Sequence, residues 1–247
     1  MNIKLAGLAL TAVLALAACG QTTPPPTDGG TDGGTDGGSG ATTGAVTVSG
    51  LPTGATAQVV DAQGMVVADQ SQLAPGEYFV VVRSGTHLNV ATKQSTTVTA
   101  GQTTEVTAPT MTKAKAVSGP SGFYFEGLSG TKPSVKVNTQ QTLVIFLKPS
   151  TTASTADFTA YAEFPGDKMF TFASGTAKVG TGAAAAVIFD PVTKVAASPA
   201  VTVAADAELV MTLKFTPTMT GDFCVAVPNL SPVGTNMNQT ACLAVTE

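Results

Sequence analysis

Three cysteines are the residues of this chain best suited to chemistry: Cys19 near the amino terminus, and Cys224 and Cys242 near the carboxyl terminus. A methionine precedes each of the last two cysteines by five residues, as Met219 and Met237. Thiolate and thioether sulfurs are soft ligands that select Cu(I). Two thiols in an oxidising compartment instead form a disulfide. The C-terminal cysteines could therefore make either a disulfide or a copper site.

The strands expected around these two cysteines decide between the alternatives. Phe223 and Val225 flank Cys224 in an alternating run, and Leu243 follows Cys242 in another. Successive side chains of a strand point to opposite faces, so pairing of the two runs places both thiols on one face, where they can meet. Residues five apart point to opposite faces, and each methionine would need a bend in its strand to join its cysteine. The spacing therefore favours a disulfide over copper.

An apolar leader precedes the first cysteine. Residues 1–18 contain a single charged side chain, Lys4, followed by an apolar stretch that ends at Ala18. This stretch is shorter than the ~20 apolar residues that a membrane-spanning helix needs. The pattern predicts a signal peptide over residues 1–18.

The end of the leader, Leu16-Ala17-Ala18-Cys19, resembles the lipobox of bacterial lipoproteins. The resemblance implies that the Cys19 thiol carries a diacylglyceryl group, that cleavage occurs directly before it, and that the new amino group is acylated, for example with palmitate. Each buried acyl CH₂ contributes ~0.8 kcal/mol, so these chains would anchor the protein stably in a membrane. In lipoproteins of enteric-type bacteria, an Asp directly after the lipidated cysteine indicates retention in the inner membrane. This chain has Gly20 at that position, so the resemblance favours the outer membrane or the cell surface. An ordinary secretory leader that contains a cysteine is the alternative.

Residues 19–44 are predicted to consist of the lipidated cysteine and a tether that follows it. Residues 20–44 contain three prolines and a TDGG repeat without apolar periodicity. Gly-rich chains behave as flexible coils, and about 25 such residues span on the order of 25–30 Å. Asp28, Asp32 and Asp36 recur every four residues, but a calcium loop needs alternating ligands and a closing bidentate carboxylate. The segment is predicted to be a disordered tether rather than a calcium site.

Composition restricts the classes of partner. Charged residues make up 11% of the chain and its net charge is −4, so no basic surface for nucleic acid is expected. Apolar residues make up 43%, which is enough for packed cores. No cofactor and no metal are expected.

The first folded region is predicted to be a small all-β domain over residues 45–110, because short β-branched runs alternate there with Gly, Pro and Asn. Three of its segments resemble PEGA-type modules: VSGLPTGA (48–55), LAPGEYFV (73–80) and VTAGQ (98–102). The resemblance covers about residues 46–108. It implies a small envelope-associated β-sandwich used for binding or spacing, not for catalysis.

The second folded region, residues 122–247, follows a predicted linker at 111–121. Its eight or nine short strand-like runs predict a two-sheet sandwich. Residues 142–147 (TLVIFL) are apolar on both faces and predict a central strand, whereas 157–164 alternates, with Phe158, Ala160, Ala162 and Phe164 on one face. Residues 215–223 loosely resemble the turn into a late strand of immunoglobulin-like domains. The predicted fold class is all-β, with two sandwich-type domains.

Enzyme signatures are weak in this chain. The nucleophile-elbow pattern G-x-S-x-G does not occur, and a Ser–His–Asp arrangement would have to use His87, the single imidazole. Paired carboxylates of the glycosidase type could come from Glu163 with Asp167, or from Asp206 with Glu208. Exposed charges at strand edges explain these pairs better than a catalytic role does.

One aromatic run could bind a ligand. Phe123-Tyr124-Phe125 could form a stacking platform for a sugar, although such a run is often half core and half rim, and the chain has no tryptophan. We therefore expect a membrane-anchored, non-enzymatic lipoprotein of the cell envelope that binds or spaces a protein or glycan partner. A glycan-binding or copper-binding lipoprotein is the alternative.

Overall fold

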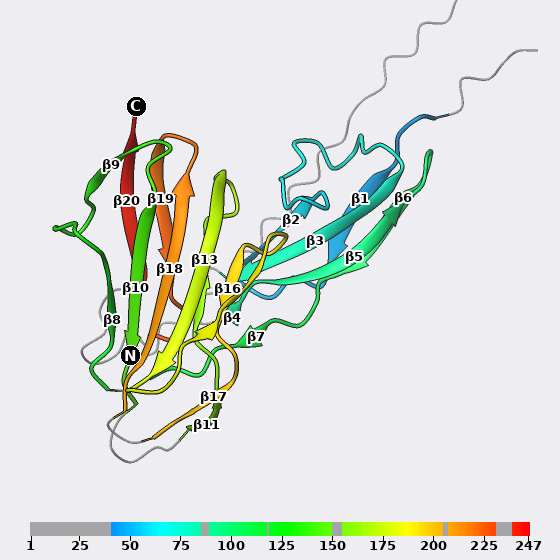
Figure 1. Cartoon of the computed structure of the whole chain (residues 1–247). Coiled ribbons are helices and arrows are strands. Elements are labelled where there is room, and N and C mark those ends of the chain that lie inside the picture. Colours follow the sequence, from blue (N-terminus) through cyan, green and yellow to red (C-terminus); the bar gives the residue numbers. More distant parts are fainter. Residues whose placement is uncertain (1–40, 85–88, 118, 150–154, 205–206, 231–238) are drawn as a thin grey trace, which may run out of the picture. The chain divides into compact units, whose positions relative to one another are not determined.

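The structure is a computed structural model, and its described residues are 41–84, 89–117, 119–149, 155–204, 207–230 and 239–247. All regular secondary structure in these ranges is β-strand (Figure 1), which confirms the predicted all-β class. None of the described residues belongs to a helix long and apolar enough to cross a membrane. The predicted signal peptide, Cys19 and most of the predicted tether lie outside the described residues.

The strands before residue 115 form three small sheets, two of which pack around a valine-rich core. The largest is antiparallel, in the order β2 (Ala55–Val60), β3 (Gly76–Ser84), β5 (Thr92–Val98). The other two sheets are strand pairs: β1 (Ala45–Ser49) runs parallel to β6 (Thr103–Thr107), and β4 (Asn89–Val90) runs antiparallel to β7 (Thr112–Lys113). β-Branched side chains suit a pleated, half-buried surface, and the core consists of Val46, Val59, Leu73, Val80, Val82, Val98 and Val106.

The strands after residue 120 form two larger sheets (Figure 1). The five-stranded sheet has the order β14 (Ala185–Ala186), β13 (Phe170–Val179), β18 (Leu209–Pro217), β10 (Gln141–Leu147), β8 (Gly122–Phe125). The six-stranded sheet has the order β15 (Ile188–Asp190), β16 (Val195–Ala197), β12 (Tyr161–Glu163), β19 (Gly221–Ala226), β20 (Thr240–Thr246), β9 (Ser134–Lys136). A separate pair joins β11 (Thr155–Phe158) to β17 (Val201–Val203).

Two of the predicted strand patterns are confirmed. The predicted central strand is β10, which pairs with β8 on one side and β18 on the other and buries residues on both faces. Phe158, Ala160, Ala162 and Phe164 are all fully buried, as their alternation indicates. The strand is interrupted between β11 and β12, where the backbone N–H of Ala160 donates to Ser198 Oγ at 2.9 Å and that of Tyr161 donates to Asn229 Oδ1 at 2.7 Å.

A cluster of phenylalanine rings fills the space between the two larger sheets. Phe164 follows β12 in the six-stranded sheet, and its ring centroid lies 5.1 Å from that of Phe215 in β18 of the five-stranded sheet. The same ring contacts four further rings, those of Phe170, Phe172, Phe189 and Phe223. One core shared by two facing sheets is the arrangement of a β-sandwich.

The predicted linker at 111–121 is held by a strand pair and by a side-chain hydrogen bond. It contains β7, and the side-chain amide of Asn229 donates to the backbone oxygen of Lys115 at 3.0 Å. A third core cluster joins Val60, Val81 and Val90 to Val192 and Val195. Residues 39–247 form one compact unit. The boundaries 45–110, 111–121 and 122–247 stay a prediction.

Candidate binding site

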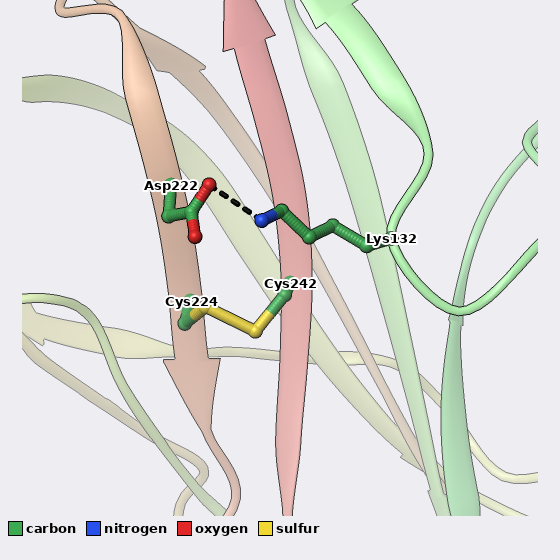
Figure 2. Close-up of a disulfide and its surroundings, with 4 residues drawn as sticks. All are labelled: Lys132, Asp222, Cys224 and Cys242. Atoms are coloured by element: carbon green, nitrogen blue, oxygen red, sulfur yellow. Dashed lines mark ion pairs between the residues drawn. A yellow bond between two sulfur atoms is a disulfide. The ribbon is translucent and has the colours of Figure 1, made fainter.

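Cys224 and Cys242 form a disulfide between neighbouring strands (Figure 2). The two residues face each other directly in the β19–β20 register, with Cα atoms 4.1 Å apart. Phe223, Val225 and Leu243 point into the core, so both sulfurs lie on the opposite, partly exposed face. The predicted pairing and shared face are confirmed, and neither sulfur is available as a thiolate ligand in this state.

We expect thiol counting on the denatured protein to find no reactive thiol at Cys224 or Cys242 until reductant is added. Reduction is expected to lower the free energy of unfolding by about 3 kcal/mol, because the link closes a loop of 18 residues in the unfolded chain. The double variant Cys224→Ser/Cys242→Ser serves as the control: it should unfold like the reduced protein and not respond to reductant. Two reactive thiols without reductant would contradict the disulfide.

A pocket of about 320 Å³ lies beside this disulfide. It is bounded by β8, by the segment that leads from β8 to β9, and by β20. Its lining combines three consecutive aromatic residues with hydroxyl-bearing and small loop residues: Phe123, Tyr124, Phe125, Leu128, Ser129, Gly130, Thr131, Pro133, Thr240 and Cys242. We call this the aromatic pocket.

The aromatic pocket is bounded by strands from both sheets of the sandwich. β8 is the edge strand of the five-stranded sheet, and β20 is next to the edge of the six-stranded sheet. The segment that leads from β8 to β9 carries Lys132. Its ammonium reaches over β20 to the Asp222 carboxylate at 2.6 Å (Figure 2). Both side chains are exposed, so the ion pair adds little stability. Its effect is to tie the pocket-lining segment to β19.

The aromatic run of β8 is divided between core and rim. Phe125 is buried, and Phe123 packs partly against the core. Tyr124 is 52% exposed, because successive strand residues point to opposite faces. The half-core, half-rim interpretation of the sequence is therefore correct, although all three residues line the pocket.

The chemistry of this lining is suited to binding. Ser129, Thr131 and Thr240 supply hydroxyl groups that can both donate and accept hydrogen bonds. Among the described residues, the lining contains no carboxylate, imidazole or amine, which are the usual groups for proton transfer in catalysis. Elsewhere in the described part of the chain, no group of three or more His, Cys, Asp or Glu side chains is placed to hold a metal.

Glu163, a member of the first carboxylate pair considered from the sequence, is bonded to an arginine and to a backbone N–H. Glu163 Oε1 accepts from Arg83 Nη1 at 2.7 Å, and its Oε2 accepts from the backbone N–H of Ala91 at 3.1 Å. Glu163 therefore belongs to an ion pair with the chain's only arginine, a partner 80 residues away that local spacing did not reveal. His87 and Asp206 lie outside the described residues.

A buried lysine lies near this ion pair. The Lys194 ammonium donates to the backbone oxygens of Gly166 at 2.7 Å and Lys168 at 2.9 Å. Burial lowers the pKa of Lys194, and the nearby Arg83 charge lowers it further, while Asp167 partly opposes the shift. The interaction fixes the turn between β12 and β13.

The fold defines an all-β protein with a two-sheet sandwich, a cross-strand disulfide and an aromatic pocket. No family model and no curated protein matches this sequence, so the resemblances to PEGA-type modules and to the lipobox stay predictions. Among solved structures, the chain is similar to the major pilin subunit of Bacillus cereus, with a TM-score of 0.35 and 13% identity over 82% of this chain and 69% of that one.

Two further solved structures match with similar TM-scores. The Corynebacterium diphtheriae major pilin SpaA matches with a TM-score of 0.30 and 14% identity over 78% of this chain and 64% of the pilin. The collagen adhesin of S. aureus matches with a TM-score of 0.29 and 9% identity over 78% of each chain. Scores of this size do not assign the chain to a family or transfer a ligand to it.

Proposed function

We propose that this chain is a lipid-anchored protein of the bacterial cell envelope that binds another envelope component and catalyses no reaction. The observation that carries the proposal is the aromatic pocket, whose described lining residues offer apolar surface and hydroxyl groups and no acid or base. Its volume of about 320 Å³ is within the range of small-ligand sites. Such a pocket can hold a sugar ring or a side chain of a partner protein.

Two features support an envelope location. Disulfides persist in exported compartments and are rare in the cytosol, and Cys224–Cys242 is one. The Leu16–Cys19 motif supplies an anchoring site, and the tether at 20–44 supplies reach from the membrane. The outer membrane or cell surface is favoured because Asp does not follow Cys19.

Mass spectrometry of the native amino terminus tests the anchor. Acyl mass on Cys19 is expected, and Cys19→Ser is expected to leave the leader uncut or release the protein from the membrane fraction. An unmodified terminus, or cleavage at another residue, would contradict lipidation without affecting the binding proposal.

Substitution of the exposed tyrosine tests the pocket. Tyr124→Ala is expected to reduce recovery of the bound envelope component by about tenfold or more, the effect of losing an aromatic hot-spot residue. Co-purification from detergent-solubilised envelope, quantified against wild type, measures it. Ile188→Ala removes an apolar side chain that is 71% exposed and outside the pocket, and should leave recovery unchanged. Equal loss from both variants would contradict a role for the pocket.

A glycan is the second candidate ligand, and the mixed lining favours it. An aromatic face can pack against the apolar side of a sugar ring, while the hydroxyls of Ser129, Thr131 and Thr240 can bond to its polar rim. Titration with oligosaccharides released from the isolated envelope distinguishes the two ligands. Binding that Tyr124→Ala removes supports a glycan, and the absence of heat or signal change contradicts binding of the released glycans.

A further inference from the structure

Three methionines from distant parts of the chain line one cavity. Met65 lies between β2 and β3, Met169 directly precedes β13, and Met219 lies between β18 and β19. All three line a cavity of about 270 Å³, which we call the methionine cavity. Their exposed fractions are 39%, 46% and 39%, whereas Met211 in β18 is fully buried. These three residues are therefore accessible from solvent, unlike a methionine that fills a core.

The backbone around the methionine cavity holds the three residues in place. The backbone oxygen of Met169 accepts from the N–H of Thr218 at 3.1 Å, which brings Met169 next to the residue that precedes Met219. The backbone N–H of Met65 donates to Asp61 Oδ1 at 2.8 Å.

The glycine before Met65 allows this loop to pack closely against another segment of the chain. Gly64 has a φ of +74°, a conformation that favours glycine. A Cβ at this position would lie 2.0 Å from the backbone oxygen of Pro191, so Gly64 is in close contact with that residue. The loop that carries Met65 is therefore packed closely against the segment after β15.

We propose that the methionine cavity binds a soft monovalent cation, Cu(I), through the thioether sulfurs of Met65, Met169 and Met219. Neutral thioether ligands select Cu(I) over hard cations. The remaining polar side chains of the lining are those of Gln58, Asp167, Lys168 and Lys194.

The ligand set of the cavity does not suit the usual divalent cations. The lining contains one carboxylate, from Asp167, and two lysines, Lys168 and Lys194. Calcium and magnesium need several oxygen ligands and more than one carboxylate as a rule. The Lys194 ammonium donates to the backbone oxygens of Gly166 and Lys168, so part of its charge is already compensated by these carbonyl groups.

This site differs from the copper site that the sequence suggested. The Met219–Cys224 spacing joined residues five apart, but the Cys224 sulfur is bonded to Cys242. The other two methionines that line the cavity with Met219 are 50 and 154 positions away in the sequence, at Met169 and Met65. Neither local spacing nor strand periodicity reveals such a set.

Competition with a chromophoric Cu(I) chelator, bicinchoninate, tests the proposal on the full chain under anaerobic conditions with ascorbate. Wild type is expected to take one more equivalent of Cu(I) than the triple variant Met65→Leu/Met169→Leu/Met219→Leu. Met169→Leu alone should weaken Cu(I) binding by about tenfold or more. Loss of a residue that only supports a metal ligand already lowers metal affinity by about 10–100-fold, and Met169 is proposed as a direct ligand. Leucine keeps volume and apolarity, so folding should be preserved.

Met111→Leu is the matched control, because Met111 packs against the first core cluster and outside the cavity. It should bind Cu(I) like wild type. Equal Cu(I) uptake by wild type and the triple variant would overturn the proposal.

A second measurement needs no variant. Peroxide oxidises accessible methionines to sulfoxides, and bound Ag(I), a redox-inert substitute for Cu(I), should slow this reaction at Met65, Met169 and Met219. Peptide mass spectrometry follows each residue, with Met111 as the internal reference. Equal oxidation rates with and without Ag(I) at the three residues would also overturn the proposal.

Discussion

Alanine in place of Phe164 is expected to lower the free energy of unfolding by about 3–5 kcal/mol, the usual loss for a fully buried phenylalanine. The side chain is 0% exposed, and its ring contacts five other phenylalanine rings, the nearest being that of Phe170 at 4.7 Å between centroids. Because these rings come from both larger sheets, the cavity left by the truncation lies at the centre of the sandwich.

Denaturant unfolding of the purified chain measures this loss. Phe146→Ala deletes the same atoms from the outer face of β10, where the ring is only half-buried, and it should cost clearly less. Phe164→Leu should fall between wild type and Phe164→Ala, since it retains more apolar volume. A Phe164→Ala loss no greater than that of Phe146→Ala would contradict the central position of this ring.

Arg83→Ala is expected to have an effect of similar size, about 3–5 kcal/mol, because it leaves a buried carboxylate without its partner. The Arg83 and Glu163 side chains are only 14% and 11% exposed. Arg83 Nη2 also donates to the backbone oxygen of Thr193 at 2.8 Å, so the guanidinium holds two separate segments. Removal of the arginine therefore disrupts the contact between β3 and the sandwich.

A double-mutant comparison separates the ion pair from general damage. Arg83→Met/Glu163→Gln removes both charges and should recover part of the stability lost in Arg83→Ala. Lys132→Ala breaks an exposed ion pair and should change stability by about 1 kcal/mol or less. If Arg83→Ala behaves like Lys132→Ala, the proposed coupling is absent.

The same unfolding curves test the predicted division at 111–121. Residues 39–247 form one compact unit, and Val60 and Val81 share a core cluster with Val192 and Val195. We therefore expect wild type to unfold in one cooperative transition. Two transitions, one for each predicted domain, would show that the two regions fold independently.

Local pattern was sufficient for much of the fold. The alternation of Phe158, Ala160, Ala162 and Phe164 identified residues that are now fully buried, and the two-sided apolar run at 142–147 identified an interior strand. The facing positions of Cys224 and Cys242 also followed from alternation. In each case the side-chain period of a strand determines which face a residue occupies.

Contacts between distant segments could not be predicted in the same way. Arg83 and Glu163 are 80 residues apart, and nothing in the residues around either one indicates the other. The pairing of β7 with β4 likewise joins segments that contain few apolar residues. The aromatic pocket depends on the path of residues 126–133 between two sheets, which strand periodicity does not determine.

The parallel pairing of β1 with β6 has a mechanical consequence for a chain held at its amino terminus. The two strands are in register over five pairs, from Ala45 with Thr103 to Ser49 with Thr107. Tension applied ahead of Ala45 acts along β1, while the chain continues from the opposite end of β6. The load is therefore distributed over all the hydrogen bonds of the pair at once, in shear, instead of opening them one after another from one end.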